Sequence, residues 1–280
     1  MTVNAALEKL KSAWRRTGSL ISVGLEPADR YLPKGFRHTV EDHERFLRLV
    51  IEAAAPCVPA FKFNMAHFEA FGSSGWAMLE RVRASIPNDC FVIMDGKRGD
   101  IGTSSEHYAR SVYEHLNADA ATVNPLMGAD AVAPFLDYSE RLTFLLTLTS
   151  NPGADDFLLD RDLFLRIAER AAAWNTHDQV GLVVGATRPE QLRAIRAMTP
   201  RMPFLIPGVG AQDGDLAGAA AGARCQASDF PGFLIHVTRG ILPPPEAHSD
   251  HLEAITKKIQ LWQTRIQDAM NQPGPRGSTP

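Results

Sequence analysis

The sequence predicts a single-domain α/β protein whose parallel strands close into a (β/α)8 barrel, the TIM barrel. Three observations favour this fold. The chain contains eight short apolar runs, helical periodicity follows these runs, and the length of 280 residues suits a barrel of about 250 residues with short extensions. An open, doubly wound parallel sheet is the alternative, because the number of strands does not show whether the sheet closes.

The expected strands are apolar over most of their length, as strands are when both faces of a parallel sheet are covered. They span residues 19–27, 57–65, 90–98, 120–125, 142–150, 180–186, 203–210 and 233–240.

Helix signals lie between these strands. Residues 107–117 and 162–175 carry apolar side chains at three- and four-residue intervals, as amphipathic helices do. Thr39 with Asp42, and Thr187 with Glu190, have the spacing of a capping box at a helix start. We expect the barrel domain to span residues 1–270 and the Pro/Gly-rich residues 271–280 to form a disordered tail.

Composition argues against several classes of partner. The net charge is −3, and no basic run is interleaved with aromatic residues, so a nucleic-acid partner is not expected. No apolar run reaches the roughly 18–20 residues that span a bilayer, and the N-terminus lacks the apolar stretch of a secretion signal. The three cysteines lack metal-type spacing and suit a reducing compartment. We therefore expect a cytoplasmic protein without a membrane partner.

Polar residues gather where the expected strands end: Glu26, Lys62, Asn64, Asp95, Lys97, Thr149, Ser150, Asn151, Gln212 and Arg239, with Pro207 and Gly208 after the seventh strand. In a barrel the carboxyl ends of all strands converge on one mouth, where the active sites of this fold lie. Strand residues two apart point to the same side, so Asp95 and Lys97 are both expected to face the interior.

The last two strand ends suit a phosphate group. The loops after strands seven and eight form the usual phosphate site of this fold. Here they offer glycine backbone N–H groups, Gln212 as a neutral donor, and Arg239 as a bidentate clamp for an anion. The glycine spacing does not match a dinucleotide-binding fingerprint.

The charged cluster Lys62, Asp95, Lys97 and Asp100 suits decarboxylation. A buried lysine between carboxylates stays protonated and can act as a general acid. A carboxylate held beside a substrate carboxylate disfavours the ground state, and loss of CO2 relieves the repulsion. The ammonium group can then stabilise and protonate the carbanion.

These motifs carry a resemblance to a known family. The segment "DGKRGDIG" at residues 95–102 resembles the D-x-K-x-x-D-I signature of orotidine 5′-phosphate decarboxylases. Other blocks resemble that family in the same order, and the nearest match is its longer bacterial branch; they are "VGLEP", "FKFN", "TSNPGA", "VVGAT", "PGVGAQ" and "TRGI".

The resemblance implies a homodimeric barrel, free of metal and cofactor, that converts orotidine 5′-monophosphate to UMP and CO2 in the last step of de novo UMP synthesis. It implies that Lys97 donates the proton, Asp95 lies beside the scissile carboxylate, and Lys62 orders the network and contacts the ribose. Asp100 and Ile101 are then expected to enter the neighbouring subunit's site, where Asp100 contacts a ribose hydroxyl.

The resemblance also implies how the rest of the nucleotide is held. Ser150 is expected to read the pyrimidine, and Gln212 and Arg239 to hold the phosphate. Further substrate-binding candidates are Glu26, Asn64, Thr103, Ser104, Pro207 and Gly208. The chain departs from the family pattern at Glu26, which replaces the usual Asp, and at Ser104, which replaces the usual Thr and follows Thr103.

Two alternatives remain. A magnesium-dependent sugar-phosphate decarboxylase of the same superfamily shares the D-x-K-x-x-D core, but it carries an acidic metal ligand at the end of strand two. Lys62 stands there in this chain and would repel a divalent cation. The other alternative is a catalytically silent nucleotide-binding barrel, for which Glu26 is the one indication.

Overall fold

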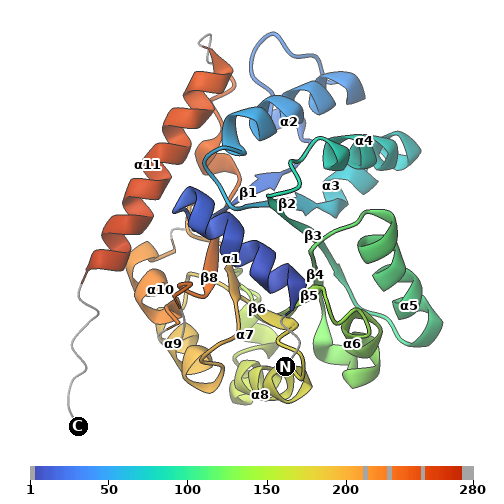
Figure 1. Ribbon diagram of the computed structural model, residues 1–280, viewed down its shortest axis with the longest axis vertical. Coiled ribbons are helices and arrows are strands. Elements are labelled where there is room, and N and C mark those ends of the chain that lie inside the picture. The colour runs from blue at the N-terminus through green and yellow to red at the C-terminus, as the bar shows by residue number, and fades with distance from the viewer. Residues whose placement is uncertain (1–3, 211–213, 226–228, 247–249, 273–280) are drawn as a thin grey trace.

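The barrel closes in sequence order (Figure 1). The computed structural model describes residues 4–210, 214–225, 229–246 and 250–272. Each strand pairs in parallel with the next, and β8 pairs with β1, so that the sheet has no edge. The strands are β1 (Ile21–Leu25), β2 (Ala60–Asn64), β3 (Phe91–Arg98), β4 (Ala120–Val123), β5 (Leu142–Leu148), β6 (Val180–Val184), β7 (Phe204–Ile206) and β8 (Phe233–Val237). The predicted (β/α)8 barrel is confirmed, and the doubly wound alternative is wrong.

All eight strands fall inside the predicted ranges but are shorter than predicted. The shortest is β7, which is flanked by Pro203 and Pro207. Proline has no backbone N–H to donate to a strand ladder, so it ends the pairing on both sides.

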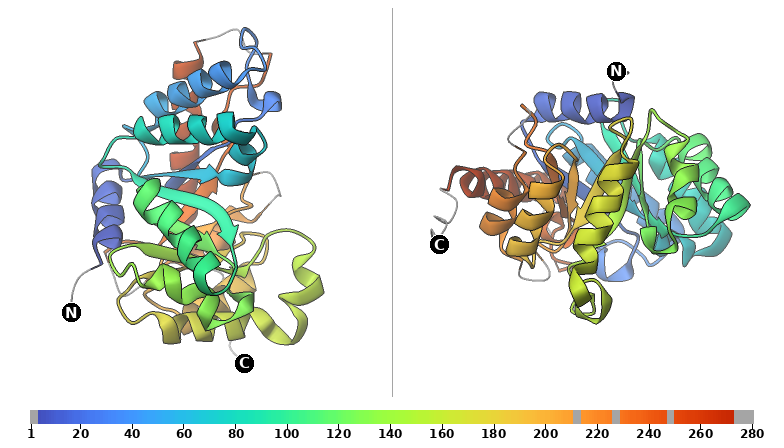
Figure 2. Two further views of the ribbon diagram at one scale, coloured as in Figure 1. Left: turned by 90° about the vertical axis from the view of Figure 1, so that its right-hand side faces the viewer. Right: turned by 90° about the horizontal axis from the view of Figure 1, so that it is seen from below.

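Helices surround the barrel, and α11 runs along one side of it (Figures 1 and 2). They are α1 (Ala5–Thr17), α2 (Val40–Ala54), α3 (Met65–Glu69), α4 (Gly72–Ala84), α5 (Gly102–Arg110), α6 (Ala129–Leu136), α7 (Ala154–Phe157), α8 (Leu163–Trp174), α9 (Pro189–Met198), α10 (Leu216–Ala223) and α11 (His251–Asn271). Short 3-10 or π turns are η1 (Asp29–Tyr31), η2 (Ser111–His115), η3 (Pro125–Met127), η4 (Asp160–Asp162) and η5 (Arg239–Ile241). The predicted tail, 271–280, lies almost wholly outside the described residues and stays a prediction.

One of the two predicted capping boxes is absent, and the other is half formed. Asp42 N–H donates to the Thr39 hydroxyl at 3.3 Å, as predicted, but the Asp42 carboxylate accepts from Arg37. Helix α9 begins at Pro189, so Arg188 takes the N-cap position, with φ −137° and ψ 74°, outside the helical region. The box at Thr187 is therefore wrong, because a residue before proline is pushed out of the helical region.

Helix α1 lies across the N-terminal ends of the strands. Its N-cap residue Asn4 donates to the carbonyl oxygen of Ser139 at 2.7 Å, and Lys9 pairs with Asp119 at 2.7 Å, just before β5 and β4 respectively. Figure 2 shows α1 against one end of the barrel. The opposite end, where the strands finish, therefore remains for the site.

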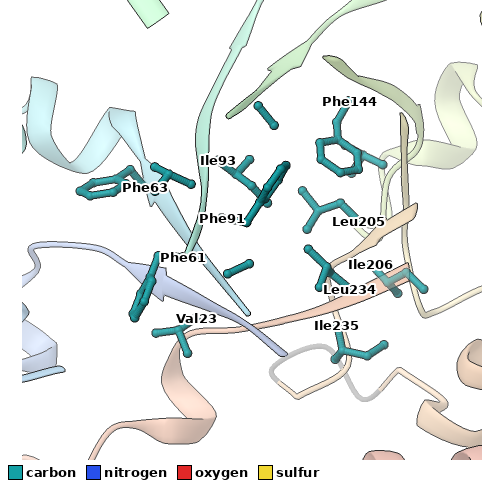
Figure 3. Packing of buried hydrophobic residues seen from close by; sticks show 14 of the residues in the cluster. Val23, Phe61, Phe63, Phe91, Ile93, Phe144, Leu205, Ile206, Leu234 and Ile235 are labelled. Atoms are coloured by element: carbon teal, nitrogen blue, oxygen red, sulfur yellow. The ribbon is translucent and has the colours of Figure 1, made fainter. Parts of the chain in front are cut away.

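Side chains alternate between the inside of the barrel and the helices around it. Figure 3 shows Phe91, Ile93, Leu205 and Leu234 grouped within the ring of strands, whereas Phe61 and Phe63 lie on its outer side. All are fully or almost fully buried. This packed interior supports the polar residues that continue the same strands toward the mouth, as period-two alternation requires.

Candidate active site

The centre of the site is a buried ion pair between β2 and β3. Lys62 and Asp95 are 4% and 7% exposed, and the Lys62 ammonium group pairs with Oδ2 of Asp95. The other carboxylate oxygen, Oδ1, accepts from Lys97 Nζ at 2.7 Å and from the Thr122 hydroxyl at 2.8 Å. Asp95 is thus held by two ammonium groups and one hydroxyl from three neighbouring strands.

Lys97 reaches Asp95 through an irregular backbone. The pairing of β3 with β4 shifts register between Met94 and Arg98, and Lys97 has a positive φ of 47°. The Lys97 N–H donates to Thr122 Oγ1 at 3.0 Å, and the side chain remains 50% exposed. A bulge re-aims a side chain in this way, and strained backbone at a strand end is common at functional sites. Lys97 thus contacts Asp95, but the bulge brings them together and not the strand alternation on which the prediction rested.

The surroundings of Asp95 fix its charge. Burial alone would raise the pKa of this carboxyl group, but the adjacent ammonium groups of Lys62 and Lys97 outweigh burial and hold the pKa well below its ordinary value. Asp95 is therefore ionised across the physiological range. The site holds a permanent negative charge between two lysines.

A cavity of about 990 Å³ opens at the ends of the strands. The sequence-predicted residues that line it are Glu26, Asn64, Ser150, Pro207, Gly208 and Arg239. Asn64 joins the cavity to the ion pair, because it is the direct ladder partner of Asp95. The structure therefore brings together residues from β1, β2, β3, β5, β7 and β8 that are far apart in the sequence.

The cavity is suited to an anionic ligand. Arg30, Arg239 and Arg265 line it, and Glu26 is its one acidic residue among the described part of the chain. Arg30 contacts the Tyr31 hydroxyl at 3.2 Å, and Arg265 stacks over the Trp262 ring at 4.3 Å. No ion pair involves any of these three arginines within the described residues, so their charge is available to a ligand.

Glu26 is held at the cavity wall by neighbouring polar groups. Its Oε1 accepts from Asn64 Nδ2 and from the Thr238 hydroxyl, both at 3.3 Å. His67 Nε2 lies 3.9 Å from Oε2. The longer side chain at this position is thus anchored through Oε1, and its carboxylate lines the cavity where a ligand hydroxyl can reach it.

Several predicted residues lie elsewhere. Asp100, Ile101, Thr103 and Ser104 occupy the β3–α5 connection and the first turn of α5, outside the cavity lining. Asp100 Oδ1 accepts from the Ile101 N–H at 2.8 Å, and no hydrogen bond or ion pair within the described residues joins Asp100 to Asp95. Gln212 lies outside the described residues, so its prediction stays open.

Sequence reasoning missed several polar residues, and three of them belong to strands or strand ends. Thr122 holds Asp95, and His236 and Thr238 line the cavity. Each is a polar residue within or just after an otherwise apolar strand, which is a usable signal in a parallel barrel. Within the parts described, no group of three His, Cys, Asp or Glu side chains could hold a metal ion, and no helix is long and apolar enough to cross a membrane.

Comparison with known proteins agrees with this geometry. Residues 20–253 match the family model "Orotidine 5'-phosphate decarboxylase / HUMPS family". A Roseiflexus castenholzii orotidine 5′-phosphate decarboxylase is 43% identical over 270 residues, covering 94% of this chain and 96% of the relative. One from Herpetosiphon aurantiacus is 39% identical over 273 residues, covering 95% and 99%.

Solved structures of an OMP decarboxylase and of a UMP synthase have a similar fold. The Leishmania donovani OMP decarboxylase has a TM-score of 0.81 at 33% identity, covering 96% of this chain and all of that one. The Leishmania donovani UMP synthase has a TM-score of 0.84 at 35% identity, covering 98% of this chain and 58% of that one. By sequence and by fold, the chain belongs to the orotidine 5′-phosphate decarboxylase / HUMPS family.

Proposed function

We propose that this protein decarboxylates orotidine 5′-monophosphate to UMP and CO2, the last step of UMP synthesis. The observation that carries the proposal is the Lys62–Asp95–Lys97 array, in which one ionised carboxylate is fixed beside a half-exposed ammonium group. The array adjoins a cavity lined by arginines, which suits a nucleotide monophosphate. The magnesium-dependent alternative is not favoured, because β2 carries the basic Lys62 into the site and the relatives are orotidine 5′-phosphate decarboxylases by name.

Asp95, Lys97 and Lys62 each have a different role in the proposed reaction. Asp95 faces the substrate carboxylate, so charge repulsion disfavours the bound substrate and disappears when CO2 leaves. The carbon–carbon bond breaks, its electron pair stays on the pyrimidine carbon, and the Lys97 ammonium group delivers a proton to that carbon. Solvent can reprotonate Lys97 because half of its side chain is exposed. Lys62 keeps Asp95 in place.

The rest of the nucleotide extends along the cavity. Ser150 reads the pyrimidine, Glu26 and Asn64 hold the ribose, and Arg239 with Gln212 binds the phosphate. In support, the first four of these line one cavity, and Glu26 is its one acid within the described residues. Pro207 and Gly208 shape the wall between the ribose and the phosphate.

We further propose a cytoplasmic homodimer in which Asp100 serves the neighbouring subunit. An apolar surface supports this proposal: Ile101, Leu126 and Met127 are 51%, 55% and 51% exposed, and Tyr108 is 37% exposed. These residues lie on adjoining segments, since a Cβ at Gly99 would lie 3.1 Å from the Asn124 side chain. Burying this surface against a second copy would carry Asp100, Ile101, Thr103 and Ser104 to the partner's site.

The test is turnover of orotidine 5′-monophosphate, followed by absorbance, with and without EDTA. Wild-type protein should turn over the substrate equally in both. Lys97→Ala should bind UMP nearly as well as wild type but lose almost all kcat, because the ammonium group matters most once the carbanion develops. A Lys97→Ala protein within tenfold of wild-type kcat would contradict the assignment, and UMP binding without any wild-type turnover would favour the silent barrel.

A further inference from the structure

A short chain of polar atoms runs along the cavity wall from β8 to Glu26. The carbonyl oxygen of Ser22 lies 3.1 Å from His236 Nδ1. His236 Nε2 lies 3.3 Å from the Thr238 hydroxyl oxygen, which is also 3.3 Å from Glu26 Oε1. His236, Thr238 and Glu26 all line the cavity.

The contacts fix the protonation of His236. A carbonyl oxygen can only accept, so Nδ1 must carry the proton that is shared with Ser22. Burial, with added repulsion from Lys62, holds the pKa of His236 well below its ordinary value, although the Asp95 charge acts in the opposite direction. A neutral imidazole has one N–H, so Nε2 is an acceptor.

The Thr238 hydroxyl therefore faces two acceptors with one proton. It can donate to Glu26 Oε1 or to His236 Nε2, but not to both. A charged carboxylate is the stronger acceptor, so Glu26 takes the proton and His236 Nε2 is left without one. His236 is half-buried and lines the cavity, so its Nε2 can take a donor from a ligand, and the cluster itself is one donor short.

We propose that a sugar hydroxyl of the ligand supplies the missing donor and that His236 is a positioning residue for this recognition. The hydroxyl donates to Glu26 Oε1 in place of Thr238, and Thr238 then turns its proton to His236 Nε2. Both acceptors then have a donor, and Asn64 still holds Glu26 Oε1. The ligand class, a ribonucleotide, rests on the proposed function.

Gly24 supplies independent support, because it leaves the space that the cluster occupies. A Cβ at this position would overlap the Thr238 hydroxyl and lie 2.9 Å from Cε1 of His236. Gly24 is also the direct ladder partner of Lys62. The chain thus omits a side chain beside the ion pair at the point where Thr238 and His236 meet.

The first test is nitrogen NMR of wild-type protein with labelled histidine. UMP should move the His236 Nε2 resonance toward lower chemical shift, as expected when an unprotonated ring nitrogen accepts a hydrogen bond. The 2′-deoxy or the 3′-deoxy analogue of UMP, whichever lacks the donating hydroxyl, should leave the resonance near its free position. An equal shift with all three nucleotides would overturn the inference.

The second test compares turnover of the substrate with turnover of its 2′-deoxy and 3′-deoxy analogues. His236→Leu removes the second acceptor, so the preference for the full ribose should fall about tenfold in kcat/KM. His236→Gln, whose amide can donate to Ser22 and accept from Thr238, should retain most of the preference. Equal preference in wild type and His236→Leu would refute the positioning role. A wild type that neither binds UMP nor turns over substrate would instead refute the proposed function.

Discussion

Replacing Lys62 with Met tests whether the central ion pair is as buried as its geometry indicates. The two side chains are 5% and 9% exposed, so removing one charge leaves the other in a poorly solvated place. Breaking such a pair costs about 3–5 kcal/mol. We expect about 3 kcal/mol, the lower end, because Asp95 keeps Lys97 and Thr122 as partners.

The pH dependence gives the effect a sign that can be checked. In wild type the two lysines lower the pKa of Asp95. The ionised carboxylate therefore stabilises the folded protein at any pH above about 3.9, the pKa of Asp in the unfolded chain, and this stabilisation is lost as the pH falls through the folded-state pKa. Without Lys62, one of the two ammonium groups that lower the pKa of Asp95 is missing, so burial raises the pKa of this carboxyl group in the folded variant. The variant then takes up a proton at a higher pH than wild type, so the difference in stability should narrow as the pH falls.

The assay is urea unfolding at pH 7 and at pH 4.5. The matched control is Lys62→Met combined with Asp95→Asn, which removes both charges and should recover to within about 1 kcal/mol of wild type. Lys97 loses its partner in this variant, but it remains solvated. If Lys62→Met unfolds at pH 7 with the free energy of wild type, the pair is not desolvated and the reasoning fails.

Three further outcomes are expected. Asp100→Ala and Lys97→Ala chains should each be nearly inactive. Subunit exchange between them should restore activity, because one of the two sites in each heterodimer then has both wild-type residues. Heterodimers that form but stay inactive would place Asp100 in its own chain's site. Arg239→Ala should raise KM for orotidine 5′-monophosphate about ten- to 150-fold, for a contact of roughly 1.5–3 kcal/mol. The kinetics with orotidine, which lacks the phosphate, should not change. An equal loss with both substrates would mean that Arg239 has a structural role. Arg196→Met should lower the free energy of unfolding by about 3 kcal/mol, because the buried guanidinium donates to four carbonyl oxygens; an unchanged urea midpoint would contradict this.

Strand periodicity explains why most of the site could be predicted. Lys62 and Asn64 are two apart on β2, so both point inward, and Asn64 lies beside Asp95 in the ladder. Parallel strands put all such ends at one mouth. The positions of Glu26 and Arg239 followed from the same rule, without any knowledge of contacts.

Contacts that depend on irregular backbone could not be predicted. The bulge that turns Lys97 back onto Asp95 is a property of β3–β4 pairing, which no single strand encodes. Thr122 stabilises that bulge through its hydroxyl, yet in the sequence it is one polar residue in an apolar run. Asp100 could be placed only by the resemblance, because its proposed partner atoms belong to a second chain.

The ion pair is better understood through the proposed chemistry than through stability. A buried salt bridge is weak evidence of stabilisation, since apolar residues of similar size often do as well. What Lys62 and Lys97 secure is a carboxylate that stays ionised while buried, because they hold the pKa of Asp95 far below its ordinary value. On the proposed function this charge must persist when a substrate carboxylate is brought beside it, since a protonated Asp95 would relieve the repulsion before CO2 could leave. On the same proposal, the arginines that line the cavity bind the phosphate at the opposite end of the ligand, and this binding offsets the repulsion.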